Sequence, residues 1–407
     1  METLIIIGEI VLISIFGSIF LYLFFLSILG LFYRRLNNFK TTKQLKIAML
    51  IPAHNEEISI AKTLKSLFEV DYPREQFDVI VVADNCTDLT AEIAKKYGAT
   101  VYERTDKTNR GKGYALRWCI DLLFKTNRGY DAISIIDADS VISKNLLSVL
   151  NFYISKGSRA IQTADLVAPQ PDAWSSEVTR LGFMLYNFVR PLGRKVINCS
   201  AGVRGNGMCF TTKTLKDVPW NTYSLNEDLE YGLVLLLNGI NVDFAPEAIV
   251  LATMPKSAKN AESQRARWER GRFPIIKKYS TKLLRYSIEK LSFRTFDAFI
   301  ELITPPFVNS VAFAMLMLLI NLVLLLFGIA FSKTFIMLWS FVILAAVAHV
   351  LIGLFTARAD VMLFKAFLFI PKYIVWKFLL YFKVFRNNKK DEWIRTTRER
   401  VSNDQPK

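Results

Sequence analysis

Residues 46–57 read KIAMLIPAHNEE, and the same pattern of an apolar run with a polar end returns at 77–88 (FDVIVVADNCTD) and at 132–140 (AISIIDADS). Each run is short, continuous and rich in Val, Ile or Ala, which is typical of a strand buried on both faces of a sheet. Stretches with helical spacing of apolar residues separate the runs. Strands that alternate with helices predict an α/β fold with a mostly parallel sheet covered on both faces.

The same alternation continues along the chain and predicts one domain over residues 45–275. Further strands are expected at 99–103 and 159–164, and helices at 57–70, 89–97, 114–124 and 142–155.

Acidic side chains follow three of the predicted strands. Glu56 follows the first, Asp84 the second, and the pair Asp137 and Asp139 follows the strand at 132–136. In open α/β sheets ligands bind at the carboxyl ends of the strands. One such residue can be a helix cap, but several carboxylates at one edge repel each other unless a cation joins them. If the chain stays extended, Asp137 and Asp139 point the same way and suit Mg²⁺ or Mn²⁺, with water and substrate phosphates completing the shell.

Three downstream features add candidate site residues. Lys112 stands between two glycines before a helix, which favours a phosphate contact over an exposed turn lysine. Asp228 opens another helix as part of Asn226-Glu227-Asp228, where an early-turn carboxylate favoured by the helix dipole is the alternative. The third feature is Gln264-Arg265-Ala266-Arg267-Trp268. Arginine forks grip phosphate oxygens, and a tryptophan face suits stacking on a sugar ring.

Three apolar runs are long enough to cross a bilayer, which takes about 20 residues. The first, at 10–33, predicts an uncleaved anchor over residues 1–35. The other two, at 307–331 and 334–356, predict a transmembrane hairpin over residues 307–356. Residues 276–306 are then expected to be an interfacial segment.

The end of the chain is also apolar but carries charge. Residues 361–382 contain Lys365, Lys372 and Lys377, so we expect a helix over 361–383 that lies in the interface, with a spanning helix as the alternative. The tail, 384–407, is basic and is predicted to be cytosolic. Basic residues also follow the first span, so the positive-inside rule predicts three spans with the domain at 45–275 in the cytoplasm.

The composition limits the partners. There are 52 Lys and Arg against 36 Asp and Glu, a formal net charge of +16. Eleven basic and three acidic residues fall within 254–290, next to a predicted span, so contact with anionic headgroups of membrane lipids is expected. The alternative function suggested by this excess of positive charge is that of a non-enzymatic membrane scaffold or a nucleic-acid binder. The acidic strand ends would repel a polyanion, so nucleic acid is not expected as a partner.

Taken together, these motifs resemble those of the membrane-bound family 2 inverting glycosyltransferases, which include the synthases of cellulose, chitin, hyaluronan and poly-N-acetylglucosamine. The signature of that family is D, DxD, (T/x)ED and Q(Q/R)xRW. It appears here, in the same order, as Asp84, Asp137-Ala138-Asp139, Asn226-Glu227-Asp228 and Gln264 to Trp268. The resemblance covers residues 45–275 and the hairpin after them.

The resemblance implies a GT-A fold that uses a nucleoside-diphosphate sugar, most often linked to UDP. It implies Asp228 as the general base and Glu227 and Trp268 as acceptor contacts. It implies a metal held by Asp137 and Asp139. By the same resemblance the donor contacts are Ala53, Glu56, Asp84, Lys112, Asp137, Gln264 and Arg267.

Two departures leave the acceptor open. Asn226 stands where Thr is usual, and residues 204–210 (RGNGMCF) occupy the region of the acceptor motif in cellulose-type synthases. We therefore keep two functions: growth of a polysaccharide at the membrane, and non-processive transfer of one sugar to a lipid acceptor. Three spans are few for a polymer channel, which favours the lipid acceptor or a homo-oligomer or export partner. The expected location is the bacterial inner (plasma) membrane.

Overall fold

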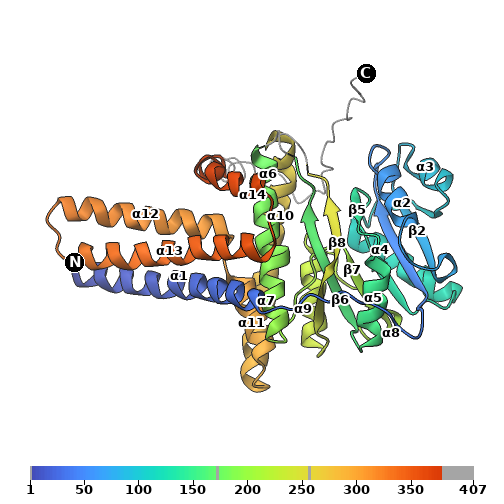
Figure 1. The fold of residues 1–407 in the computed structure, drawn as a ribbon, viewed down its shortest axis with the longest axis horizontal. Coiled ribbons are helices and arrows are strands. Elements are labelled where there is room, and N and C mark those ends of the chain that lie inside the picture. Colours follow the sequence, from blue (N-terminus) through green and yellow to red (C-terminus); the bar gives the residue numbers. More distant parts are fainter. Residues whose placement is uncertain (1, 171–173, 255–257, 378–407) are drawn as a thin grey trace.

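A bundle of three helices projects from one side of an α/β domain (Figure 1). The computed structural model describes residues 2–170, 174–254 and 258–377. The bundle consists of α1 (Glu2–Leu31), α12 (Phe307–Leu326) and α13 (Ser332–Thr356). All three are long and apolar enough to cross a membrane. The predicted transmembrane runs therefore form helices that lie side by side, with the α/β domain at one end.

The α/β domain is built on one mixed sheet with the strand order β3-β2-β1-β4-β7-β6-β8-β5 in the described part of the chain. Pairing is parallel among β3, β2, β1 and β4 and between β6 and β8. It is antiparallel where β7 joins β4 to β6, and at the edge between β8 and β5. The bounds are β1 Ile47–Ala53, β2 Phe77–Asp84, β3 Thr100–Arg104, β4 Ala132–Ile135, β5 Ser140–Ile142, β6 Ala160–Val167, β7 Met208–Thr211 and β8 Val242–Ala252.

Helices cover both faces of this sheet, as the apolar runs predict. Along β1, Ala48 and Leu50 belong to one hydrophobic cluster, whereas Ile47, Met49 and Ile51 belong to the cluster on the opposite face. A strand that buries both sets of side chains has to be apolar at every position. The helices packed around the sheet are α2 Ile60–Phe68, α3 Thr90–Lys96, α4 Lys112–Thr126, α5 Leu146–Ser155, α8 Thr212–Asp217 and α9 Glu227–Leu237.

Helices α6, α7 and α10 lie between the sheet and the bundle, with α11 below and α14 above the junction end of the bundle (Figure 1). A π-helical segment, Met184–Val189, joins α6 to α7. The long α10 leads into α11, and α14 follows the bundle. The bounds are α6 Trp174–Phe183, α7 Arg190–Val196, α10 Ala258–Glu289, α11 Phe293–Ile303 and α14 Val361–Ala366.

Three local predictions are wrong. Asp137 and Asp139 do not continue a strand, because β4 ends at Ile135 and the two carboxylates stand in the turn before β5. The helix predicted at 142–155 starts at Leu146, since Ile142 is the last residue of β5. The two helices of the hairpin are separated by residues 327–331 rather than by two residues.

The bundle is packed by aromatic rings and a few polar contacts. Phe16 stacks on Phe313 with ring centroids 4.5 Å apart. The buried carboxylate of Glu9 accepts hydrogen bonds of 2.8 Å from Asn321 and from Trp339. His349 lies 2.6 Å from the hydroxyl of Ser27. This histidine, on α13, is thus hydrogen-bonded to α1 within the bundle.

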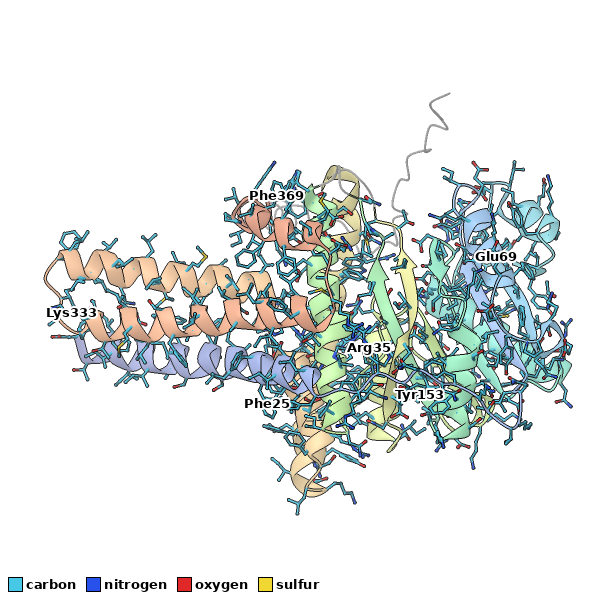
Figure 2. All side chains as sticks on the ribbon, in the orientation of Figure 1. Phe25, Arg35, Glu69, Tyr153, Lys333 and Phe369 are labelled. Carbon is cyan, nitrogen blue, oxygen red and sulfur yellow. The ribbon has the colours of Figure 1, made fainter. Side chains whose placement is uncertain are left out.

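Charged residues mark the two ends of the bundle. Arg35 lies at the junction with the α/β domain, and Lys333 at the far tip (Figure 2). Beside the junction, Phe293, Phe296 and Ile303 of α11 are exposed, which fits an interfacial segment at 276–306. Residues 370–377 are helical. Residues 378–383 of the predicted helix at 361–383, together with the tail 384–407, lie outside the described residues.

Candidate functional site

A cleft of about 1450 Å³ opens at the carboxyl ends of the parallel strands. Its walls come from both halves of the sheet, from α6, α9 and α10, and from the start of α12. All eleven residues predicted for the site line it: Ala53, Glu56, Asp84, Lys112, Asp137, Asp139, Glu227, Asp228, Gln264, Arg267 and Trp268.

One end of the cleft is built on β1 and β2, where the nucleoside is expected. Asp84 is the last residue of β2, and its register partner on β3 is Arg104. The Arg104 guanidinium donates to Asp84 Oδ1 at 2.6 Å and to Asp106 Oδ2 at 2.8 Å. Burial raises the pKa of Asp84, and the Arg104 guanidinium opposes this shift. Arg104 is thus a positioning residue that the sequence analysis missed.

The next part of the cleft joins the start of α4 to the turn after β4. Lys112 Nζ donates to Asp137 Oδ1 and to the carbonyl oxygen of Gly205, each at 2.5 Å. Asn206 accepts from the backbone N–H of Asp137 at 3.0 Å and donates to Ser140 Oγ at 2.9 Å. The loop around residues 204–207 therefore holds the acidic turn in place.

The donor set in this turn fits a divalent cation that the substrate completes. No group of three or more His, Cys, Asp or Glu side chains is placed to hold a metal within the ranges that the structure describes. Burial and the charge of Asp139 raise the pKa of Asp137, while Lys112 lowers it. Two carboxylates that disfavour each other's charge suit Mg²⁺ or Mn²⁺ when phosphate oxygens and water fill the remaining positions.

The two carboxylates of the Asn226-Glu227-Asp228 motif lie in the first turn of α9. Asp228 packs against Gly205, where a Cβ atom would come within 2.7 Å of the carboxylate. Gly205 also has φ +85°, a conformation that favours glycine. Burial and the neighbouring Asp228 raise the pKa of Glu227 to about 7. The site thus holds two adjacent carboxylates in different environments.

The last motif lies on α10, which closes the cleft from the membrane side. Asn226 donates to the backbone carbonyl of Trp268 at 3.2 Å, so the third and fourth motifs are linked directly. The Trp268 ring lies 5.6 Å from Phe183. Arg265 is used differently from the expectation, because it donates to Ser175 O and to the Thr179 hydroxyl of α6. Its role is to hold α6 and α10 together.

A mixed sheet flanked by helices, with an acidic turn after a central strand and a cleft at the carboxyl ends, defines the GT-A class of glycosyltransferase folds. The sequence profile described as "Glycosyltransferase like family 2" matches residues 44–271. Because this match covers more than half of the chain, the protein belongs to that family.

Among the proteins that are similar to parts of the chain are two curated relatives and one solved structure. The beta-monoglucosyldiacylglycerol synthase of a Nostoc species is 27% identical over 59% of this chain and 51% of its own length. The poly-beta-1,6-N-acetyl-D-glucosamine synthase of Staphylococcus epidermidis is 23% identical over 56% of this chain and 55% of its own. The chain thus spans about half the length of these relatives.

The similar structure is the mannosyltransferase PcManGT of Pyrobaculum calidifontis, in complex with GDP-Man and Mn²⁺. It is 16% identical, covers 83% of this chain and 96% of its own, and has a TM-score of 0.53. At 16% identity, this similarity supports the fold alone and says nothing of the roles of the site residues.

Proposed function

We propose that this protein transfers a sugar from a nucleoside-diphosphate donor, most simply a UDP-sugar, to an acceptor at the membrane surface. One observation carries the proposal. A single cleft is lined by Asp84, Lys112 and Asp137 on the sheet side, by Asp228 of α9, and by residues 305–308 around the start of α12. The donor and acceptor sites can therefore face each other across the base.

The chemistry is a single displacement with inversion at the anomeric carbon. The bond from that carbon to the diphosphate oxygen breaks, and the diphosphate leaves with the electron pair. The acceptor oxygen forms the new bond from the opposite face, and its proton passes to the Asp228 carboxylate. Lys112, Gln264 and Arg267, which line the same cleft, would hold the diphosphate. Asp137 and Asp139 would hold Mg²⁺ or Mn²⁺, which when bound neutralises the leaving group.

A lipid acceptor has the stronger support from the described residues. Phe307 and Val308 open α12, a candidate span, and both line the cleft. A headgroup at Asp228 could thus keep its chains in the bilayer. The bundle itself is filled by side chains such as Phe20, Phe335 and Trp339, which does not favour a polymer passing between its helices.

Growth of a polysaccharide is the second candidate. Trp268 lines the cleft close to Phe183, and such a surface can support the sugar ring of a glycan acceptor. The relationship to the Staphylococcus epidermidis synthase favours the same reading. A homo-oligomer or an export partner would then supply the path that the packed bundle lacks.

The test is a donor screen on membranes that contain the protein. UDP-, GDP- and dTDP-sugars are supplied with a radiolabel, and released nucleotide and product size are measured. One discrete glycolipid supports the lipid acceptor, and a ladder supports the polymer. Asp228→Asn serves as the matched control, since it keeps the size of the side chain. Nucleotide release no higher than that of membranes lacking the protein, with every donor, would refute the proposal.

A further inference from the structure

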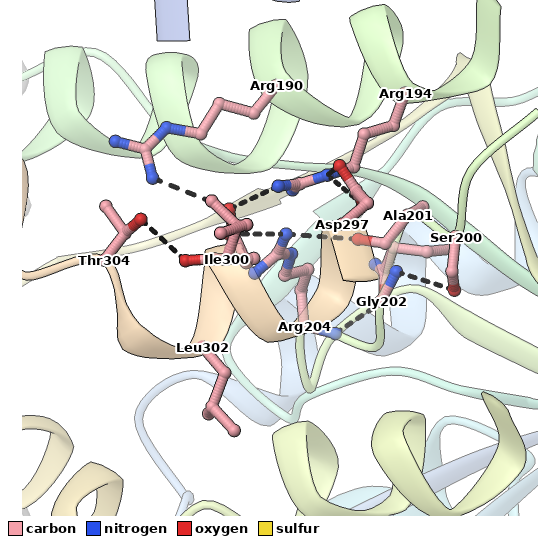
Figure 3. A network of polar contacts seen from close by, with 12 residues as sticks. Arg190, Arg194, Ser200, Ala201, Gly202, Arg204, Asp297, Ile300, Leu302 and Thr304 are labelled. Carbon is pink, nitrogen blue, oxygen red and sulfur yellow. Dashed lines mark hydrogen bonds and ion pairs between the residues drawn. The ribbon is translucent and has the colours of Figure 1, made fainter. Parts of the chain in front are cut away.

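A cluster of buried charge lies at the membrane end of the cleft, apart from the residues assigned to the donor. Arg190 and Arg194 extend from α7, Arg204 comes from the loop before β7, and Asp297 and Glu301 lie on α11 (Figure 3). Arg190, Arg194, Asp297 and Glu301 are buried, and the side chain of Arg204 is 5% exposed. Three guanidinium groups share two carboxylates, so the cluster carries one excess positive charge.

The two carboxylates are used mainly by Arg194 and Arg204. Arg194 donates to Asp297 Oδ2 at 2.9 Å and to Glu301 Oε2 at 2.6 Å. Arg204 donates to Glu301 Oε1 at 3.3 Å and to the Ala201 carbonyl at 3.1 Å. Asp297 also accepts from the hydroxyl of Tyr22 on α1. These bonds satisfy both carboxylates, and the third arginine, Arg190, forms no hydrogen bond to either of them among the described contacts.

Arg190 has the weakest ion pair of the three arginines. The residue is only 4% exposed, and its Nε, like that of Arg204, is buried with no hydrogen-bond partner among the described residues. Its nearest carboxylate is Glu301, at 3.9 Å from Nη1. Burial lowers the pKa of Arg190, and Glu301 opposes that shift. Burying a cation without a close partner is costly, and an incoming anion would reduce that cost.

The excess charge faces the cleft. Arg190 and Arg204 both line it, as does Tyr186, whose ring centroid lies 4.1 Å from the Arg204 guanidinium carbon and 5.2 Å from that of Arg190. Two acidic residues, Asp165 and Asp228, line the same cleft. Asp165 accepts from Asn187 and Asn206, and burial raises its pKa well above the usual range, which favours its neutral form. Asp228 adjoins Gly205, the residue after Arg204.

We propose that Arg190 and Arg204 bind the phosphate of an anionic lipid acceptor and so place its headgroup hydroxyl beside Asp228. This inference rests on the proposed function with a lipid acceptor and deepens it, because it names the acceptor class. Arginine forks match phosphate oxygens in geometry and charge. The wall formed by residues 305–308 leads from this site to α12, which gives the lipid chains a path to the bilayer.

Lipid binding to the full chain in neutral detergent, followed by native mass spectrometry, tests the site without turnover. The probes are phosphatidylglycerol, which carries phosphate and hydroxyls, and diacylglycerol, which carries no phosphate. We expect one phosphatidylglycerol to remain bound to the wild type and diacylglycerol to be lost. Arg190→Gln should lower the affinity for phosphatidylglycerol by about tenfold or more, as expected for a lost charge-assisted bond, and Arg190→Lys should recover part of it.

A neutral control and a second variant separate loss of the binding site from loss of folding. Arg285 is exposed and pairs only locally with Glu289, so Arg285→Gln should bind like the wild type. Arg204→Gln provides a second variant should Arg190→Gln fail to fold. Equal binding of phosphatidylglycerol by the wild type and the folded variants would show that the arginines do not bind the lipid phosphate. Displacement of the lipid by UDP would also contradict the proposal, since the arginines would then form part of the donor site. Inorganic phosphate binding as tightly as the lipid would overturn the lipid assignment.

The proposed function is tested separately. If the lipid binds through Arg190 and no sugar donor is turned over, the proposed function fails and the anion site stands. If sugar transfer to a lipid is observed and Arg190→Gln binds phosphatidylglycerol normally, only the site fails.

Discussion

The ammonium group of Lys112 lies 2.5 Å from Asp137 Oδ1 and equally close to the carbonyl oxygen of Gly205. A single side chain at the start of α4 therefore joins the acidic turn to the loop that packs on Asp228. Burial opposes the charged form of Lys112, but Asp137, Glu227 and Asp228 together raise its pKa. The raised pKa favours its cationic form, and under the proposed function this charge would share in holding the diphosphate.

Removal of divalent cations should abolish sugar transfer. The reason is that Asp137 and Asp139 disfavour each other's charge and need a counter-ion to hold the diphosphate. EDTA is expected to stop nucleotide release, and Mg²⁺ or Mn²⁺ to restore it. Asp139→Ala should be inactive at all metal concentrations, whereas Asp217→Ala, a change at an exposed ion pair with Arg159, should be neutral. Full activity of Asp139→Ala in chelator would refute this role.

Asp228→Asn should lower kcat by about 10²–10⁴, the range typical of a lost acid–base group. A base acts in the transition state more than in donor binding, so the affinity for the nucleotide should hardly change. Single-turnover kinetics and calorimetric titration with UDP separate the two effects. Glu227→Gln is the informative comparison, because burial raises the pKa of Glu227 to about 7. A normal rate in Asp228→Asn with a large loss in Glu227→Gln would move the base to Glu227.

Stability should depend on pH through Glu230, which links α9 to α10. Burial opposes its charge, but hydrogen bonds from Lys278, Ser224 and Tyr279 outweigh this and lower its pKa. A lowered pKa stabilises the fold above the unfolded value near 4.5 and loses this effect as the pH falls through the folded value.

We therefore expect Glu230→Gln to melt lower than the wild type at pH 7, and the difference to shrink as the pH falls below 4.5. The difference at pH 7 should be about 2 °C, since Lys278 is largely exposed and water screens the pair. Differential scanning fluorimetry in detergent measures it, with Arg285→Gln as the neutral control. A difference that stays the same size down to the lowest pH at which the protein folds would exclude the ionised carboxylate as its cause.

Labelling of intact cells should place the two ends of the bundle on opposite sides of the membrane. Lys333 lies at the far tip and Arg35 at the junction (Figure 2), and basic residues favour the cytoplasmic side. We expect Lys333→Cys to react with an impermeant maleimide from outside, and Lys43→Cys and a cysteine at position 400 to react only after lysis. External labelling at position 400 would show that the helix at 361–383 spans the membrane.

Most of the fold could be predicted because its strands and spans are continuous apolar runs. The rule that ligands bind at the carboxyl ends of strands placed Asp84 and Asp137 at one edge. The sequence could not show that the chain turns at Asp137, because the turn depends on bonds from Asn206, 69 residues away. Strand β8 was missed since Pro246 and Glu247 interrupt its apolar pattern.

Partners far apart in sequence account for the other omissions. Arg104 meets Asp84 only through the register of two parallel strands. The cluster around Arg194 assembles side chains from α7 and α11, which are more than 100 residues apart. Single residues of this kind carry no local pattern, so only the folded structure reveals them.

Gly205→Ala should reduce turnover strongly while the protein still folds. The backbone at Gly205 has φ +85°, and an added Cβ would come within 2.7 Å of the Asp228 carboxylate. The methyl group therefore has to push the base away or move the carbonyl oxygen that Lys112 contacts. We expect kcat to fall by about tenfold or more, since displacement of a catalytic group by about 1 Å has large effects on rate.

Gly98→Ala is the matched control for this change. Gly98 has the same φ of +85°, but its Cβ would meet only the Phe68 ring, at 4.0 Å. Gly98→Ala thus measures the cost of the backbone conformation alone and should lower the melting temperature without changing kcat. Equal kinetic effects of the two substitutions would show that backbone strain, and not contact with Asp228, explains the loss. Normal turnover in Gly205→Ala would mean that Asp228 does not act from the position it occupies here.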